Sequence, residues 1–186
     1  MGHDGNVQTI FLAMGCFWGA EELYWETPGV LETAVGYMGG TASAPTYEQV
    51  CTGTTGHTET VEVRYDTDVV STLDILRIFW ENHDPTQGMR QGNDIGSQYR
   101  SAIFWTTTEQ EFLATATRDA YQVTITALGY GPITTQILPA SAEHFFPAEQ
   151  YHQKYLLKNP FGYRCHAKTG IALEFTVPGT PAHPAG

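Results

Sequence analysis

Cys16 is the residue whose type and position best suit covalent chemistry. It lies in the segment GCFWG (residues 15–19), directly after the apolar run 7–14 and before a helix-like stretch that starts at Ala20. The unpaired amides and the dipole of a helix N-terminus stabilise a thiolate, and the two rings beside Cys16 would form an apolar wall. A lone cysteine more often packs as a small buried residue. The flanking glycines and the strand-to-helix turn instead favour a nucleophile aimed at a small apolar group.

Glu59 is the acidic residue whose position most strongly suggests a function. Residues 59–65 alternate between apolar and polar side chains, as in a strand with one buried face. Glu59 has the parity of Val61, Val63 and Tyr65, so its carboxyl points to the apolar side. A buried carboxyl is costly unless it is paired or functional.

The elements that would position these residues alternate between strands and helices. After the strand at 7–14, the pattern predicts a helix over 20–26, strands over 30–37 and 59–65, a helix over 71–81 and a strand over 101–105. Ser71 and Asp74 resemble a capping box at the start of the second helix. This order over residues 7–106 is that of the split βαβ, ferredoxin-like plait, an α+β fold with helices on one face of the sheet.

The second half of the chain adds further elements to this plait. A helix is expected over 108–127, a strand over 133–138 and a helix over 147–157. The apolar residues that recur at helical spacing in the first of these are Phe112, Leu113, Ala116, Ala120, Val123 and Ala127. Beyond Asn159 the chain resembles a long loop-like tail, whose last ten residues look disordered. The loop over 84–98 is long enough to suggest a binding role.

Composition limits the classes of function. The chain has 186 residues, 41% of them hydrophobic, which suits one globular domain, and no apolar run approaches the roughly 20 residues of a membrane span. Its 20 acidic residues exceed 9 scattered basic ones, so nucleic acid is not an expected partner. The first residues lack the features of a secretory signal, and three cysteines are an odd count that cannot form a disulfide framework. We expect a cytoplasmic monomer with reactive thiols.

Five motifs resemble those of the class A peptide methionine sulfoxide reductases, which reduce the S epimer of methionine sulfoxide. They are GCFWG at 15–19, GYxGG at 36–40, YExVCxGxxGHxE at 47–59, HDPT at 83–86 and QGNDxGxQYRS at 91–101. The motifs are co-linear, and the resemblance extends from residue 7 to about residue 165, which is nearly the whole chain. It implies a thiol-dependent oxidoreductase.

The resemblance implies a role for each matching residue. Cys16 corresponds to the attacking thiolate, and Phe17 and Trp18 to the pocket for the methyl group of the substrate. The residues implied to hold and protonate the sulfoxide oxygen are Glu59, Tyr47, Tyr99 and, less directly, Asp94. This division suits a sulfoxide, whose sulfur becomes electrophilic once its oxygen accepts hydrogen bonds. Glu59 can donate only when it is protonated, and burial raises the pKa of a carboxyl.

The resemblance also implies how the thiol is regenerated. Attack leaves a sulfenic acid on Cys16, and a second thiol condenses with it to a disulfide that thioredoxin or another dithiol reopens. Cys165 is the expected resolving thiol, and the rival, Cys51, is expected to be a small buried residue. Members of the family often carry two recycling cysteines in the tail. This chain has one beyond its core, which suggests a single Cys16–Cys165 disulfide.

These assignments divide the chain into an N-terminal extension (1–6), a catalytic domain (7–158) and a loop-like tail that carries the resolving cysteine (159–186). The implied substrates are oxidised proteins or peptides and free methionine sulfoxide, and the implied partner is thioredoxin. No bound cofactor and no metal are expected.

Three alternative functions fit parts of the sequence. His57 and Glu59 resemble the His-x-Glu of zinc deaminases, but the Pro-Cys-x-x-Cys of that site is missing, and the other histidines lack ligand spacing. A hydrolase that uses His57 as its base would need the imidazole within hydrogen-bonding distance of Cys16. A non-enzymatic binding module would use an aromatic cage for a peptide methyl group. The residues of such a cage would be Phe17, Trp18, Tyr37, Tyr47 and Tyr99.

Overall fold

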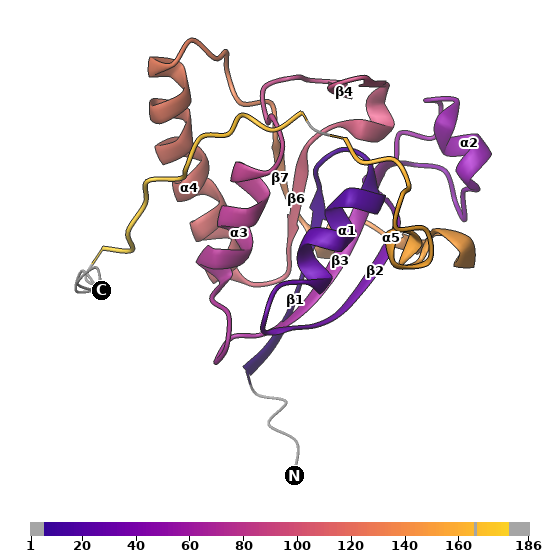
Figure 1. Ribbon diagram of the computed structural model, residues 1–186, viewed down its shortest axis with the longest axis horizontal. Helices are drawn as coiled ribbons and strands as arrows, with labels where there is room; N and C mark the ends of the chain where they lie inside the picture. The colour runs from indigo at the N-terminus through magenta and orange to yellow at the C-terminus, as the bar shows by residue number, and fades with distance from the viewer. Residues whose placement is uncertain (1–5, 166, 179–186) are drawn as a thin grey trace.

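The computed structural model describes residues 6–165 and 167–178, and its longer helices lie against a six-stranded sheet (Figure 1). The strand order is β7-β6-β1-β3-β2-β8. The strands are β1 (Val7–Ala13), β2 (Val30–Met38), β3 (Thr58–Asp66), β6 (Ala102–Trp105), β7 (Gln136–Pro139) and β8 (Phe146–Pro147). All neighbouring pairs are antiparallel except β6 and β7, which are parallel. The α+β class expected from the sequence is therefore confirmed, with a mostly antiparallel sheet.

Three connections between strands contain the helices that cover this sheet. α1 (Phe17–Trp25) joins β1 to β2, and α3 (Thr72–Glu81) lies between β3 and β6 in the chain. Because β1 and β2 both pair antiparallel with β3, they run in the same direction on either side of it. α4 (Thr108–Ala127) follows β6 and precedes β7. None of the helices within the described ranges is long and apolar enough to cross a bilayer.

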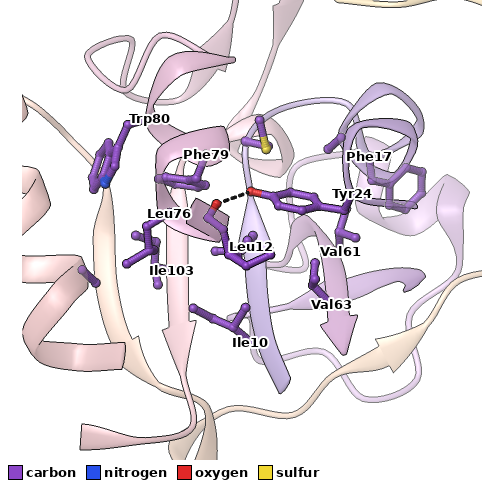
Figure 2. Close-up of a cluster of buried hydrophobic side chains, with 14 of the residues drawn as sticks. Ile10, Leu12, Phe17, Tyr24, Val61, Val63, Leu76, Phe79, Trp80 and Ile103 are labelled. Atoms are coloured by element: carbon purple, nitrogen blue, oxygen red, sulfur yellow. Dashed lines mark hydrogen bonds between the residues drawn. The ribbon is translucent and has the colours of Figure 1, made fainter. Parts of the chain in front are cut away.

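The main core lies between one face of the sheet and these three helices. Ile10 and Leu12 of β1 alternate onto this face with Val61 and Val63 of β3, and all four are fully buried (Figure 2). Tyr24 of α1 lies in the same cluster, and its hydroxyl donates a 3.1 Å hydrogen bond to the carbonyl of Ile75. The two-residue period of β3 carries Glu59 onto this face as well, beside the start of α1.

Two helices in the first half of the chain differ from the sequence prediction. α1 begins at Phe17 instead of Ala20, because Cys16 has non-helical dihedral angles (φ −51°, ψ 121°) and the helix starts directly after it. α2 (Tyr47–Cys51) was not predicted. Its start carries a capping box in which the Thr46 hydroxyl accepts from the Gln49 amide, while the Gln49 side chain accepts from Thr46. This sequence signal was present, but α2 is too short to show apolar periodicity.

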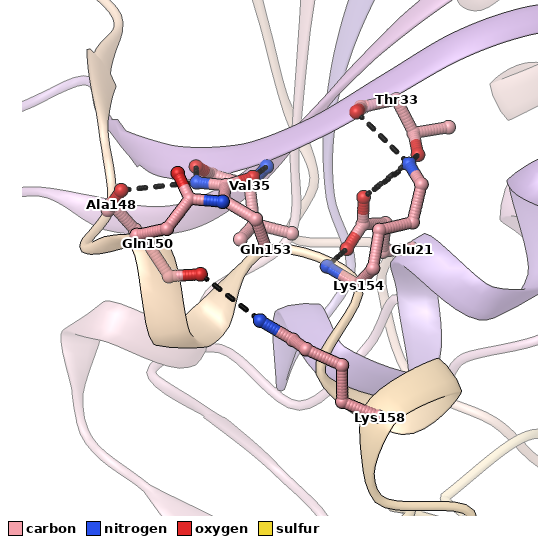
Figure 3. Close-up of polar contacts among 8 residues, drawn as sticks. All are labelled: Glu21, Thr33, Val35, Ala148, Gln150, Gln153, Lys154 and Lys158. Atoms are coloured by element: carbon pink, nitrogen blue, oxygen red, sulfur yellow. Dashed lines mark hydrogen bonds and ion pairs between the residues drawn. The ribbon is translucent and has the colours of Figure 1, made fainter.

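The prediction of a single helix over 147–157 is wrong. The segment contains the end of β8, a 3-10 turn (Gln150–His152) and the short α5 (Tyr155–Lys158). Lys154 interrupts the segment with a left-handed conformation, φ +53°. The Gln153 side chain bonds to both the amide and the carbonyl of Val35 at 2.9 Å, so it pairs with β2 as another strand would (Figure 3).

The buried face of α4 was also predicted incorrectly. Phe112 and Val123 are 57% and 73% exposed. The face that packs on α3 includes polar Thr117, whose hydroxyl accepts a 2.8 Å bond from the Trp80 indole. Apolar spacing missed this face because satisfied polar side chains contribute to it. β7 begins at Gln136, three residues later than predicted, because the Ile133 and Thr134 amides donate outside the sheet.

The tail contains no regular element between residues 159 and 178 within its described part, as expected. It nevertheless packs along α3 and α4. Leu173 is 3% exposed, and its amide donates a 2.7 Å bond to Glu81 at the end of α3. The Tyr121 hydroxyl of α4 donates to the carbonyl of Ile171 at 2.9 Å. Residues 1–5 and 179–186, most of the extension and of the end expected to be disordered, lie outside the described ranges.

Candidate active site

Cys16 lies where β1 ends and α1 begins, and its side chain is half-buried. The preceding Gly15 makes the turn with φ +93°, and a Cβ at this position would come within 2.8 Å of the Gln91 side chain. Glycine is required here both for the positive φ and for the close approach. The sharp turn places the thiol at the N-terminus of α1, as the sequence predicts.

A pocket of about 200 Å³ opens beside this thiol. Its walls come from α1, α2, β3, the short strand β5 (Asp94–Ile95), the 3-10 turn Ser97–Tyr99 and the tail. The lining residues are Cys16, Phe17, Trp18, Tyr47, Glu59, Asp94, Tyr99 and Tyr163. The fold therefore brings together seven of the eight site residues expected from the sequence. The exception is Cys165.

Glu59 forms the buried floor of this site. Its side chain is 2% exposed, and its Oε1 accepts a 3.1 Å hydrogen bond from the amide of Phe17. Burial raises the pKa of Glu59 to about 8, and the charge of Asp94 adds to the rise, against the opposing effect of the Phe17 amide. A carboxyl with this pKa is mostly protonated at neutral pH and can act as a donor.

The thiol of Cys16 does not have the depressed pKa expected for a helix N-terminus. Burial raises the pKa of Cys16, and the negative charge of Glu59 raises it further. The amides of Trp18 and Gly19 favour the thiolate, but they do not outweigh burial. The sulfur ionises more readily when Glu59 is neutral, because that removes one like charge.

Two tyrosines complete the polar side of the pocket. Burial raises the phenol pKa of both Tyr47 and Tyr99, and the charge of Glu59 contributes at each. Both hydroxyls are therefore neutral and able to donate. The Tyr47 amide, at the start of α2, donates to Glu149 at 2.7 Å, and the second oxygen of Glu149 accepts from Tyr37 at 2.8 Å.

The apolar side is built from Phe17 and Trp18. Phe17 is buried, and the Trp18 indole stacks on Tyr155 with ring centroids 3.8 Å apart. The indole nitrogen donates a 3.0 Å bond to Nδ1 of His152, whose ring also lies 4.6 Å from that of Tyr47. Burial lowers the pKa of His152, which keeps Nδ1 available as an acceptor. His152 supports the wall and carried no motif by which the sequence could single it out.

Asp94 and Tyr163 meet at the mouth of the pocket. The Tyr163 hydroxyl lies 3.3 Å from Oδ2 of Asp94 and donates to it. Burial raises the pKa of Asp94, and the contact with Tyr163 opposes that rise. No sequence motif singles out Tyr163, although it lies two residues before Cys165.

Cys165 lines a second hollow, of about 150 Å³, which Cys16 also lines. The Cys165 thiol donates to the carbonyl of Gln91 at 3.5 Å, and all three cysteines are free. Cys51, expected to be buried, is exposed at the end of α2. That expectation is wrong because the short helix leaves its last residue at the surface.

The arrangement does not support the alternatives that rely on His57. Its Nδ1 accepts from the Gly40 amide at 3.0 Å, and its Nε2 lies 2.6 Å from the carbonyl of Ala42. Both ring nitrogens are thus occupied by main-chain groups, and His57 does not line either hollow beside Cys16. Among the residues that the structure describes, no group of three His, Cys, Asp or Glu side chains is placed to hold a metal ion.

Comparison with known proteins identifies the family. The sequence model of the family described as peptide methionine sulfoxide reductase matches residues 8–178. The peptide methionine sulfoxide reductase MsrA of Rhodospirillum centenum is 56% identical over 177 residues, which cover 91% of this chain and 80% of the relative.

Solved structures agree with this match. Methionine sulfoxide reductase A of Corynebacterium diphtheriae superposes with a TM-score of 0.83 at 48% identity, covering 91% of this chain and 83% of the other. Reduced Mxr1 from Saccharomyces cerevisiae superposes with a TM-score of 0.80 at 32% identity, and the match covers 94% of this chain and 96% of Mxr1. The chain therefore belongs to the class A peptide methionine sulfoxide reductase family and is an oxidoreductase.

Proposed function

We propose that this enzyme reduces the S epimer of methionine sulfoxide, in peptides and as the free amino acid, through a Cys16 sulfenic acid. The observation that carries this proposal is the composition of the pocket beside Cys16. Phe17 and Trp18 supply apolar surface, and Glu59 and two tyrosines supply polar groups, to the same pocket. A methyl sulfoxide has the same two faces around an electrophilic sulfur.

In the proposed first step, the sulfoxide oxygen accepts hydrogen bonds from the protonated Glu59 and from the hydroxyls of Tyr47 and Tyr99. These bonds draw electron density from the substrate sulfur. The Cys16 thiol loses its proton and its sulfur attacks the substrate sulfur, while Glu59 supplies a proton to the oxygen. The oxygen passes to Cys16 as the hydroxyl of the sulfenic acid, methionine leaves, and the thiol proton restores the Glu59 carboxyl. Asp94 contributes less directly, by holding the Tyr163 hydroxyl at the mouth of the pocket.

In the proposed second step, Cys165 attacks the sulfenic acid and forms a disulfide with Cys16. The shared hollow supports this pairing over one with Cys51, which is exposed on α2 and does not line that hollow. Thioredoxin or another dithiol then reduces the disulfide, so the enzyme needs no bound cofactor. The structure of Mxr1 has been solved in complex with Trx2, which supports the proposal of a thioredoxin partner for the present enzyme.

We also propose a cytoplasmic monomer, in which residues 7–158 form the catalytic domain after a short extension (1–6) and before the tail (159–186). Three free cysteines suit a reducing compartment. The strand order β6-β1-β3-β2 supports a split βαβ plait of the ferredoxin-like kind as its scaffold.

A single-turnover assay tests the activity. The reduced enzyme is mixed with a peptide that contains either the S or the R epimer of methionine sulfoxide, and methionine is measured without added reductant. We expect a stoichiometric burst from the S epimer, none from the R epimer, and none from Cys16→Ser with either. A burst that survives in Cys16→Ser would overturn the proposal, and equal bursts from both epimers would overturn its stereochemistry.

A further inference from the structure

A partly buried ion pair joins the helix that begins after Cys16 to the residue before Cys165. The Arg164 guanidinium holds the carboxylate of Glu22 with two bonds, from Nε at 2.8 Å and from Nη2 at 2.7 Å. The Glu22 and Arg164 side chains are 21% and 31% exposed. The pair lowers the pKa of Glu22 and raises that of Arg164, so both stay charged across the working pH range.

The same guanidinium also organises the turn that leads to Cys165. Its Nη1 donates to the carbonyls of Pro160 and Gly162, at 2.9 and 3.3 Å. A guanidinium with this many fixed partners restricts the backbone around it, which a lysine ammonium with one bond would not do. Arg164 therefore restrains the backbone conformation of residues 160–164, which lead to Cys165.

The tail is attached again a few residues after Cys165. The Tyr121 hydroxyl contacts the Thr169 hydroxyl at 2.6 Å and donates to the carbonyl of Ile171, and Leu173 is buried against α3 and α4. Cys165 thus lies on a short stretch between two attachments, one on α1 and one on α3 and α4. Glu22 and Arg164 line the same 150 Å³ hollow as the two thiols, whereas neither lines the substrate pocket.

We propose that the Glu22–Arg164 ion pair is a positioning device for the resolving thiol, which speeds formation of the Cys16–Cys165 disulfide and leaves sulfoxide reduction unaffected. This proposal rests on the proposed function. In the step concerned, the Cys165 sulfur attacks the sulfenic sulfur of Cys16, a sulfur–sulfur bond forms, and the sulfur–oxygen bond breaks. The oxygen leaves as water with the proton of Cys165, and no further reactant is needed.

The physical basis is effective concentration. A thiol on a freely moving tail lies near its target for only a small fraction of the time. A thiol on a short segment that is attached at both ends lies near its target for a much larger fraction. A charge-assisted pair with two parallel bonds is strong enough to change such a population by about tenfold. The effect should be confined to the second step, because neither Glu22 nor Arg164 lines the substrate pocket.

The test separates the two steps in the full-length enzyme. Glu22→Gln removes the charge at nearly constant shape, and Arg164→Lys keeps the charge but loses the paired bonds. Glu32→Gln is the matched control, because it breaks an exposed pair with Arg64 that joins β2 and β3 at 3.9 Å. Rapid-quench methionine release reports the first step, and thiol counting with peptide mapping reports the disulfide.

We expect Glu22→Gln to release methionine at the wild-type rate and to form the disulfide about tenfold more slowly, with the sulfenic acid trapped by a nucleophilic probe. Arg164→Lys should show an intermediate delay, and Glu32→Gln none. Disulfide formation at the wild-type rate in Glu22→Gln would overturn the proposal, as would an equal loss in both steps, which indicates general destabilisation. Failure of the wild-type enzyme to release methionine would instead overturn the proposed function.

Discussion

The amide of Phe17 donates a 3.1 Å hydrogen bond to Oε1 of Glu59, so the buried carboxyl lies at the N-terminus of the helix that starts beside the Cys16 thiol. The free amides of that terminus are divided between two acidic groups, since those of Trp18 and Gly19 favour the thiolate of Cys16. Each group raises the pKa of the other when it is charged. The Cys16–Glu59 pair therefore favours at most one negative charge at a time.

The first prediction concerns the pH dependence of sulfoxide reduction. The pKa of Glu59 is raised to about 8, so the protonated donor is present below this pH and is lost above it. The single-turnover rate of methionine release at saturating substrate should therefore lose its acid-dependent contribution above about pH 8. Glu59→Gln should be slower by about 100-fold or more and lack this step. A wild-type profile in Glu59→Gln would contradict the acid role.

The second prediction concerns stability, and it uses the same pKa. Glu59 has an ordinary pKa of 4.5 when exposed and one of about 8 in the fold, so the folded state binds more protons between these values. The contribution of Glu59 to the free energy of unfolding is therefore greatest at low pH and is lost as pH rises from 4.5 to 8. Glu59→Gln removes the cost of burying a charge, so its free energy of unfolding should exceed that of wild type by a few kcal/mol at pH 9 and by much less at pH 5. Urea denaturation at the two pH values measures this difference, and a variant less stable than wild type at pH 9 would refute it.

Sequence patterns predicted the parts of this fold that follow simple periods. The strands β1, β2 and β3 were predicted to within one residue at each end, because alternation onto one buried face is strong in them. The parity argument also placed Glu59 on the core side without any family comparison. The place of Cys16 beside a pocket was predictable because GCFWG combines a turn glycine, a thiol and two rings in five residues.

The predictions that failed concern parts of the structure that depend on long-range polar contacts. Residues 147–157 have helical composition, but Gln153 bonds to Val35 of a distant strand, and no local pattern encodes that pairing. The roles of His152 and Tyr163 in the pocket likewise arise from contacts across more than 60 positions of sequence. The rise that burial causes in the pKa of Cys16 could likewise not be predicted, because burial is a property of the assembled site.

The third prediction distinguishes the two candidate resolving thiols. Cys165 shares a hollow with Cys16, whereas Cys51 is exposed on α2. Cys165→Ser should therefore release about one methionine per enzyme and then stall with thioredoxin, while Cys51→Ser should turn over at close to the wild-type rate. Steady-state assays with thioredoxin and its reductase measure both variants. Continued cycling by Cys165→Ser would exclude its role, and stalling by Cys51→Ser would assign the role to Cys51.

The fourth prediction concerns the apolar wall. Trp18→Phe keeps a ring that can stack on Tyr155 but loses the 3.0 Å bond to His152. One lost hydrogen bond is worth about 1 kcal/mol, so kcat/KM should fall about fivefold, mainly through KM. Trp18→Ala removes the wall and should lower kcat/KM by about 100-fold. If both variants retained the wild-type KM, the substrate methyl group would have to bind elsewhere.

The fifth prediction concerns the contacts that hold the His152 segment to α1. The carboxylate of Glu21 is 1% exposed and accepts from the Lys154 ammonium at 3.1 Å and from the Thr33 hydroxyl at 2.7 Å (Figure 3). Lys154→Met leaves this buried charge without its counter-ion, which should cost about 2–3 kcal/mol of the free energy of unfolding in urea. Lys158→Met is the control, because that ammonium bonds only to the carbonyl of Gln150 in this cluster. The double variant Glu21→Gln/Lys154→Met should recover part of the loss, since the uncompensated charge is then gone; if it is no more stable than Lys154→Met alone, the ion pair is not the source of the effect.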